Sequence, residues 1–136
     1  MESIKKNKIL STIVLVKGIL TVLLGIIHII MSYFEYNLIK DEMPKYIGYK
    51  YILWYYAVGL FILFIGLIDI ISYKGIKQKI NLAWQISLLN SIFSLVLGLS
   101  GLITFKCALS PPYFLFAIGI ICLIPLLLFK KEFNNK

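Results

Sequence analysis

The chain alternates between long apolar stretches and short stretches that carry lysines. The apolar stretches cover about residues 9–33, 51–71, 82–105 and 113–129. A helix needs about 20 residues to cross the hydrocarbon core of a bilayer, and each stretch is close to that length. The pattern therefore predicts four transmembrane helices, which make up a single all-α domain over residues 1–136.

Small and polar residues recur at seven-residue spacing on one face of the first three stretches, while the other faces carry Ile, Leu, Val and Phe. These residues are Ser11, Gly18, Gly25, Ser32, Gly59, Gly66, Ser87, Ser91, Ser94, Gly98 and Gly101. Helices in lipid pack through small residues and polar contacts. The spacing favours near-antiparallel packing with short connections, so we expect an integral membrane, up-down-up-down four-helix bundle. The same faces would equally suit a homo-oligomer.

The composition argues against a soluble domain and against a nucleic-acid partner. Hydrophobic residues make up 60% of the chain and charged residues 15%, whereas soluble domains have about 45–50% and about 25%. The formal net charge is +8. Because the lysines lie at the ends of the apolar stretches, they point to anionic lipid headgroups rather than to nucleic acid. Membrane lipids are therefore the expected partners.

The distribution of lysines predicts the orientation in the membrane. Three precede the first stretch, three lie between the second and third, and three follow the fourth, whereas Lys40, Lys45, Lys50 and Lys106 lie on the other side. Positively charged residues accumulate on the cytoplasmic side. We therefore expect a multi-pass protein of the cytoplasmic membrane with both termini in the cytoplasm, and its longest connector, residues 37–50, outside.

Ionisable residues inside the apolar stretches suggest a polar cluster near the cytoplasmic side. A charge at the centre of a span costs roughly 2.5–3.5 kcal/mol, so such residues usually face protein or a cavity. Asp69 has Lys17 or Lys74 as a structural partner, or it serves in proton or cation coupling. Gln85 and Asn90 lie at similar depth, and they either complete this cluster or bridge helices by hydrogen bonds.

Nearer the outer side, four residues are candidates for a ligand pocket. His28 lies on the small-residue face, Trp54 and Tyr55 open the second helix at the same level, and Glu35 lies beyond them. A histidine here either binds a ligand or exchanges protons, or it is a structural imidazole with Tyr55, Ser100 or a backbone group as its partner. Only if His28 binds a ligand do the four residues predict an outward-facing pocket.

No pattern for catalysis or metal binding emerges. The serines follow packing spacing, and no glycine-rich phosphate loop is present. One histidine without nearby cysteine or carboxylate ligands is a poor metal site. We therefore expect no catalytic residues, no metal and no cofactor, which favours a non-enzymatic protein over an enzyme that uses His28 as a base.

Three short motifs carry a resemblance to a known group. They are Gly25-Ile-Ile-His28, the stretch Trp54–Gly59 followed by Gly66, and Ser110-Pro-Pro-Tyr113 followed by Gly119. With them, the chain resembles a group of small bacterial four-helix integral membrane proteins that are DoxX-like in architecture. The resemblance implies a fold and a membrane location, and it implies no activity.

Three functions are compatible with these features. The favoured one is a non-enzymatic bundle that binds a small or lipidic ligand, or a membrane partner, through the outward-facing pocket. The second is a small proton-coupled transporter that uses Asp69. The third is an immunity-type protein that shields the membrane from a peptide toxin.

Overall fold

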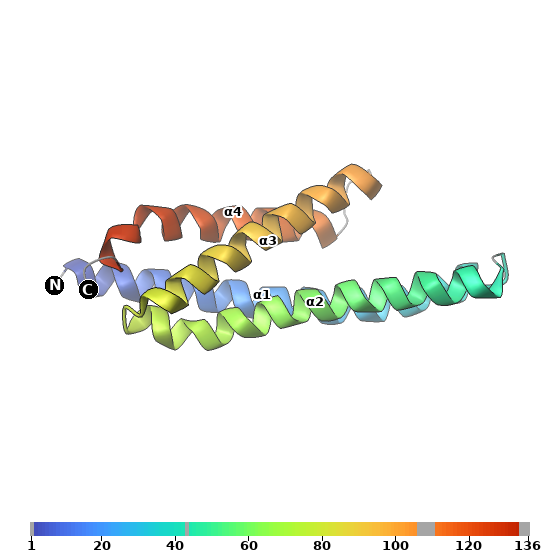
Figure 1. Cartoon of the computed structure of the whole chain (residues 1–136), viewed down its shortest axis with the longest axis horizontal. Coiled ribbons are helices and arrows are strands. Elements are labelled where there is room, and N and C mark those ends of the chain that lie inside the picture. The colour runs from blue at the N-terminus through green and yellow to red at the C-terminus, as the bar shows by residue number, and fades with distance from the viewer. Residues whose placement is uncertain (1, 43, 106–110, 134–136) are drawn as a thin grey trace.

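The structure, a computed structural model, describes residues 2–42, 44–105 and 111–133. These residues form long helices joined by short connectors, which confirms the all-α fold class (Figure 1). The helices are α1 (Glu2–Ile39), α2 (Lys45–Lys77), α3 (Asn81–Phe105) and α4 (Pro111–Leu128), followed by the 3-10 helix η1 (Lys130–Glu132). Lys106 and Ser110, used above for the orientation and the resemblance, lie outside the described residues.

Three of the helices are long and apolar enough to cross a membrane. Their apolar parts are Lys6–Ile39, Lys45–Lys77 and Asn81–Ile103. The apolar part of α4, Pro112–Leu128, is shorter. At 1.5 Å per residue, the 18 residues of α4 measure about 27 Å, against about 30 Å for the hydrocarbon core. α4 is thus at the short end of the lengths that span a bilayer.

The helices form two antiparallel pairs, α1 with α2 and α3 with α4 (Figure 1). All four meet at one end, which we call the basal end, where α1 begins, α2 turns into α3 and α4 ends. A hydrophobic cluster drawn from every helix fills it: Leu10, Val14, Ile76, Ala83, Trp84, Cys122, Leu126 and Phe133. The indole nitrogen of Trp84 donates a hydrogen bond of 2.9 Å to the Leu126 carbonyl oxygen. This bond gives a partner to a carbonyl in the last turn of α4.

Glycines bring the backbones of α1 and α2 together. A Cβ atom on Gly18 would lie 2.9 Å from the Gly66 carbonyl oxygen, and one on Gly25 would lie 3.0 Å from that of Gly59. The seven-residue faces predicted for these helices therefore meet each other. Helices in lipid associate through close packing of this kind, because the hydrophobic effect does not favour their association there.

Many polar side chains lie inside the bundle and many large apolar side chains lie on its surface, unlike in a soluble protein. The buried polar and charged residues are Asn7, Ser11, Lys17, Thr21, Ser32, Asp69, Ser72, Ser87, Asn90, Ser91 and Ser94. Large apolar side chains are exposed on all four helices, as with Ile9, Ile71, Ile103 and Leu128. An apolar exterior of this kind suits a lipid surrounding.

At the end opposite the basal end, α1 and α2 continue past α3 and α4 (Figure 1). We call this distal part of the pair, residues 33–42 and 44–54, the overhang. The connector predicted over residues 37–50 is wrong, because α1 runs to Ile39 and α2 begins at Lys45. Residues 37–43 contain no proline or glycine that would end a helix earlier, and Pro44 holds the N-cap position of α2. The ends of the apolar stretches therefore did not mark the ends of the helices.

Gly66→Ala tests whether backbone contact holds α1 and α2 together. A Cβ atom there would lie 2.6 Å from the Val22 backbone nitrogen and 2.7 Å from the Gly18 carbonyl oxygen. Alanine favours a helix by about 1 kcal/mol over glycine, so a lower Tm in detergent micelles would have to come from separating the two helices. We expect that loss. An unchanged or higher Tm would contradict the close packing, and Leu60→Phe, on an exposed position of α2, should leave the Tm unchanged.

Candidate functional site

A buried ion pair joins α1 to α2 in the middle of the bundle. The Lys17 ammonium nitrogen lies 2.6 Å from the Asp69 carboxylate oxygen Oδ2. Lys17 is 3% exposed and Asp69 is 0% exposed. Of the two lysines that the sequence offered to Asp69, the structure uses Lys17. The pair lies beside one of the glycine contacts between the two helices, since Gly18 follows Lys17 directly.

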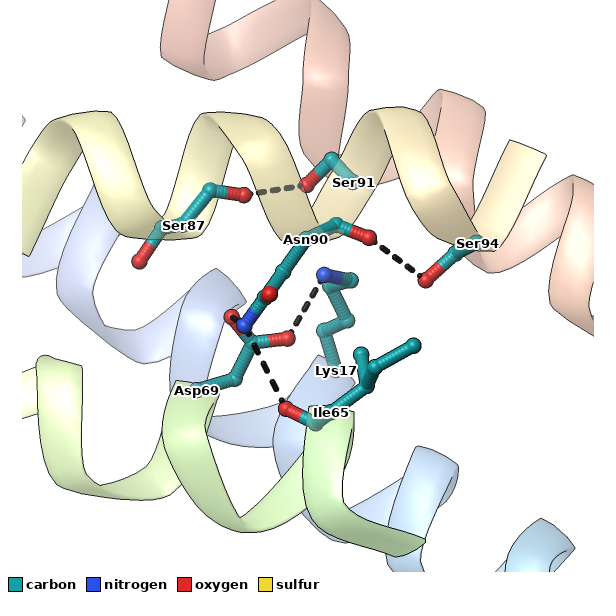
Figure 2. A network of polar contacts seen from close by, with 7 residues as sticks. All are labelled: Lys17, Ile65, Asp69, Ser87, Asn90, Ser91 and Ser94. Atoms are coloured by element: carbon teal, nitrogen blue, oxygen red, sulfur yellow. Dashed lines mark hydrogen bonds and ion pairs between the residues drawn. The ribbon is translucent and has the colours of Figure 1, made fainter. Parts of the chain in front are cut away.

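Asn90 brings the third helix into this polar cluster, as Figure 2 shows. Its Nδ2 donates a hydrogen bond of 3.1 Å to Asp69 Oδ1 and lies 3.4 Å from the Ile65 carbonyl oxygen. Both carboxylate oxygens of Asp69 therefore have donors from other helices. The cluster thus ties α1, α2 and α3 together at one level.

Gln85, the fourth residue predicted for the cluster, does not join it and is exposed. Gln85 and Asn90 are five residues apart, which places them about 140° apart around the helix. Only one of them can face α2. Asn90 shares the face of Ser87 and Ser94, and this spacing is the signal in the sequence that separates the two candidates.

The serines beside Asn90 bond to their own helix. Ser91 Oγ donates to the Ser87 carbonyl oxygen and Ser94 Oγ to that of Asn90, both at 2.8 Å (Figure 2). These bonds give both hydroxyls a partner within α3. The serines therefore act as small packing residues, as their spacing predicted. The hydroxyls of Ser87 and Thr21 are buried without a hydrogen-bond partner.

This cluster has the chemistry of a structural tie. A buried carboxylate that serves in proton transfer needs a path to water, whereas Asp69 is fully buried and its oxygens are occupied by Lys17 and Asn90. Removing one member of such a pair leaves an uncompensated charge, which is strongly destabilising. The geometry thus favours the structural interpretation of Asp69 over proton or cation coupling.

Towards the overhang, His28 packs against tyrosines of α2. The rings of His28 and Tyr55 are stacked, with 5.7 Å between centroids and 7° between planes, and Tyr51 stacks on Tyr55 at 4.4 Å. A Cβ atom on Gly59 would lie 3.2 Å from His28 Cδ2, so this glycine makes room for the imidazole. The Tyr55 backbone lies within hydrogen-bonding reach of the ring, yet Nε2 is buried without a hydrogen bond of its own.

The four residues predicted for the outer pocket do not converge on one point. His28 and Tyr55 face each other, whereas Glu35 is exposed and Trp54 is 70% exposed. Tyr51, which the sequence reasoning missed, completes the ring stack. Its position one helical turn before Tyr55 was the available signal. The arrangement gives a stiffened helix pair with an exposed aromatic surface.

Among the described residues, no group of three or more His, Cys, Asp or Glu side chains is placed to hold a metal ion. Comparison of the chain with protein-family models, curated proteins and solved structures finds no match. The functional argument below therefore rests on the geometry of the chain itself.

A double-mutant cycle tests the central pair. Lys17→Met or Asp69→Asn alone leaves one buried charge without its partner, and we expect each to lower the free energy of unfolding by about 3–5 kcal/mol. The double variant should regain most of that loss, because the new amide oxygen still accepts the hydrogen bond from Asn90. Unfolding by SDS in mixed micelles measures all four proteins. Losses that simply add in the double variant would contradict the pairing.

Proposed function

We propose that this chain is a non-enzymatic, multi-pass protein of the cytoplasmic membrane whose overhang binds a second membrane protein. In this proposal the four helices span the membrane up-down-up-down, and the basal end with both termini faces the cytoplasm. The observation that carries the binding function is the overhang, where helices α1 and α2 expose apolar side chains beyond the rest of the bundle (Figure 1).

Placement in a membrane is supported by the surface of the molecule. Three helices are long and apolar enough to cross a bilayer, and the polar side chains are turned inward. Lysines of the N-terminal segment, the α2–α3 turn and η1 gather at the basal end. Positively charged residues accumulate on the cytoplasmic side, so this end is the proposed cytoplasmic end.

The lengths of α1 and α2 support a part that projects from the membrane. At 1.5 Å per residue, the 38 residues of α1 measure about 57 Å, nearly twice the hydrocarbon core. If the core begins just after Lys8, about 20 residues carry α1 to the level of His28. The remaining turns then pass through the headgroup layer and leave it. The 33-residue helix α2 runs back towards the membrane beside these last turns of α1.

The side chains of this projecting part are unusually apolar for a surface in water. Leu38 is 80% exposed and Tyr49 is 67% exposed, and Phe34, Tyr46 and Trp54 are also exposed. Exposed apolar patches on a water-facing surface mark protein contacts. Trp54 lies near the expected membrane boundary, where tryptophan is common, so its exposure needs no partner. Leu38 lies at the tip, away from that boundary, and its exposure favours a protein partner.

A second membrane protein is the partner that suits this position. The tip carries charges of both signs in Lys40, Asp41, Glu42 and Lys45, which disfavours a polyanionic partner. The stack of His28, Tyr55 and Tyr51 fixes the two helices against each other. A stiff pair loses little conformational freedom on binding, which helps affinity.

Photocrosslinking tests this function directly. With Tyr49→p-benzoylphenylalanine in the native membrane, we expect one discrete product between this chain and another membrane protein. Adding Leu38→Asp should lower its yield about tenfold or more, because burying a leucine contributes about 1.5–3 kcal/mol. The Tm of that variant should not change, since the side chain is exposed.

The same label at Val96, an exposed position of α3 within the predicted span, serves as the control and should capture only lipid. A product at Tyr49 made only of lipid, or of two copies of this chain, would contradict the proposed partner.

Cysteine labelling tests the orientation. In a chain with Cys107→Ser and Cys122→Ser, we expect a membrane-impermeant maleimide to label Asp41→Cys in intact cells and Gln78→Cys only after permeabilisation. The first site lies in the α1–α2 connector and the second in the α2–α3 turn. The opposite pattern would reverse the proposed orientation, and equal labelling at both sites would contradict a membrane-spanning α2.

Proton-coupled transport is the second candidate, favoured by one observation, the carboxylate of Asp69 beside Lys17 in the middle of the bundle. The double variant Lys17→Met/Asp69→Asn separates the two roles. If the pair is structural, the double variant stays folded and functional. If the Asp69 carboxylate couples protons to transport, the double variant loses transport, because an amide cannot replace a carboxylate in that role.

A further inference from the structure

A groove of about 380 Å³ opens at the basal end, between the start of α1 and the α2–α3 turn. It is lined by Asn7, Lys8, Lys77 and Lys79. Its volume lies within the roughly 300–1,000 Å³ of small-molecule sites. The groove is at the opposite end of the molecule from the overhang, so the two sites are independent.

Lys79 occupies a backbone conformation that normally belongs to glycine. Its φ is 61°, the left-handed region, and no other described non-glycine residue has a positive φ. The Ile80 N–H bonds the Gly75 carbonyl oxygen at 2.8 Å, and the Lys79 N–H bonds that of Ile76 at 3.1 Å. These two bonds form a Schellman motif, whose left-handed position is usually glycine. A lysine there adds strain, and its side chain lines the groove.

Asn7 supplies a polar group without a partner in the wall of the groove. The residue is 4% exposed, and its side-chain oxygen Oδ1 is buried with no hydrogen bond. A buried acceptor without a donor is unfavourable in a folded protein. A ligand that brings a hydroxyl donor into the groove would satisfy it.

The carboxylate of Glu132 also reaches Lys79. Glu132 Oε2 of η1 lies 3.4 Å from the Lys79 ammonium nitrogen, and both side chains are partly exposed. An exposed pair of this kind contributes little to stability. An anionic ligand in the groove would compete with Glu132 for Lys79.

We propose that this basal groove binds a glycerophosphate group. Lys8, Lys77 and Lys79 bind the phosphate oxygens, and the Asn7 side-chain oxygen accepts a hydrogen bond from a glycerol hydroxyl. Lysine is a common phosphate ligand. A phosphatidylglycerol headgroup in the adjacent leaflet and free glycerol phosphate carry the same chemistry, and the experiment below distinguishes them.

Native mass spectrometry of the full chain in a neutral detergent tests the site, with phosphatidylglycerol and phosphatidylcholine of matched acyl chains as probes. We expect tighter binding of phosphatidylglycerol. Lys77→Gln/Lys79→Gln should weaken it by about 25-fold, at about fivefold for each lysine. Lys130→Gln/Lys131→Gln removes the same charge from exposed positions of η1 at the same end, and should change affinity little. Equal losses in the two double variants would overturn the site.

Two further variants test the strained turn and its carboxylate. Lys79→Gly should raise the Tm, because glycine removes the left-handed strain, and should weaken phosphatidylglycerol binding about fivefold. Glu132→Gln should strengthen binding, because it removes the competitor for Lys79. A lower Tm in the glycine variant, or unchanged binding in both variants, would overturn the assigned role of Lys79.

The hydroxyl contact has its own test. Wild-type protein should prefer phosphatidylglycerol to phosphatidylmethanol, which lacks the hydroxyls, and Asn7→Leu should abolish that preference. Displacement of the lipid by soluble glycerol phosphate identifies a soluble source, and binding of the lipid alone identifies the headgroup. Either supports the proposed chemistry. Inorganic phosphate competing as well as glycerol phosphate, or an unchanged preference in Asn7→Leu, would overturn it.

Discussion

Direct backbone contact between α1 and α2 is the constraint on which the rest of the structure depends. Lipid gives two apolar helices no reason to associate, because their surfaces are already in an apolar solvent. The glycines of the two helices remove the side chains that would hold them apart, and carbonyl oxygens then lie against the opposite backbone. Because the glycines on each helix are seven residues apart, the contact also fixes how far one helix is shifted along the other.

That register decides which polar side chains meet. Lys17 precedes a contacting glycine of α1, and Asp69 lies three residues after one of α2, so the ion pair forms at the first contact. His28 lies three residues after the next glycine of α1, and it meets Tyr55 there. A shift of one helical turn would move Lys17 by about 5.4 Å along α2 and leave a buried charge without its partner. The ion pair therefore penalises every other register, and the glycines permit this one.

Most of this core can be predicted from the sequence. The predictions that are wrong each relied on depth in the membrane or on hydropathy alone. The small-residue faces of the helices and the Lys17–Asp69 pair could be predicted from the sequence. A charge within an apolar helix needs a partner, and few candidate partners lie within reach of Asp69. Gln85 was assigned by depth alone, although the direction around the helix also matters. The connector was placed where the apolar stretches stop, although α1 runs on to Ile39. Hydropathy reports the surrounding solvent, while helix ends depend on breakers such as Pro44.

The middle of the bundle and its two ends differ in which side chains have a partner. In the middle of the bundle, the charges of Lys17 and Asp69 are matched, and the groups left without a partner are the neutral hydroxyls of Thr21 and Ser87. At the two ends the balance differs. The overhang exposes apolar side chains beyond the ends of α3 and α4, and the basal groove contains a strained Lys79 and an Asn7 oxygen without a hydrogen bond. Natural proteins break such local rules mainly at functional sites, which supports the binding partner that we propose for each end.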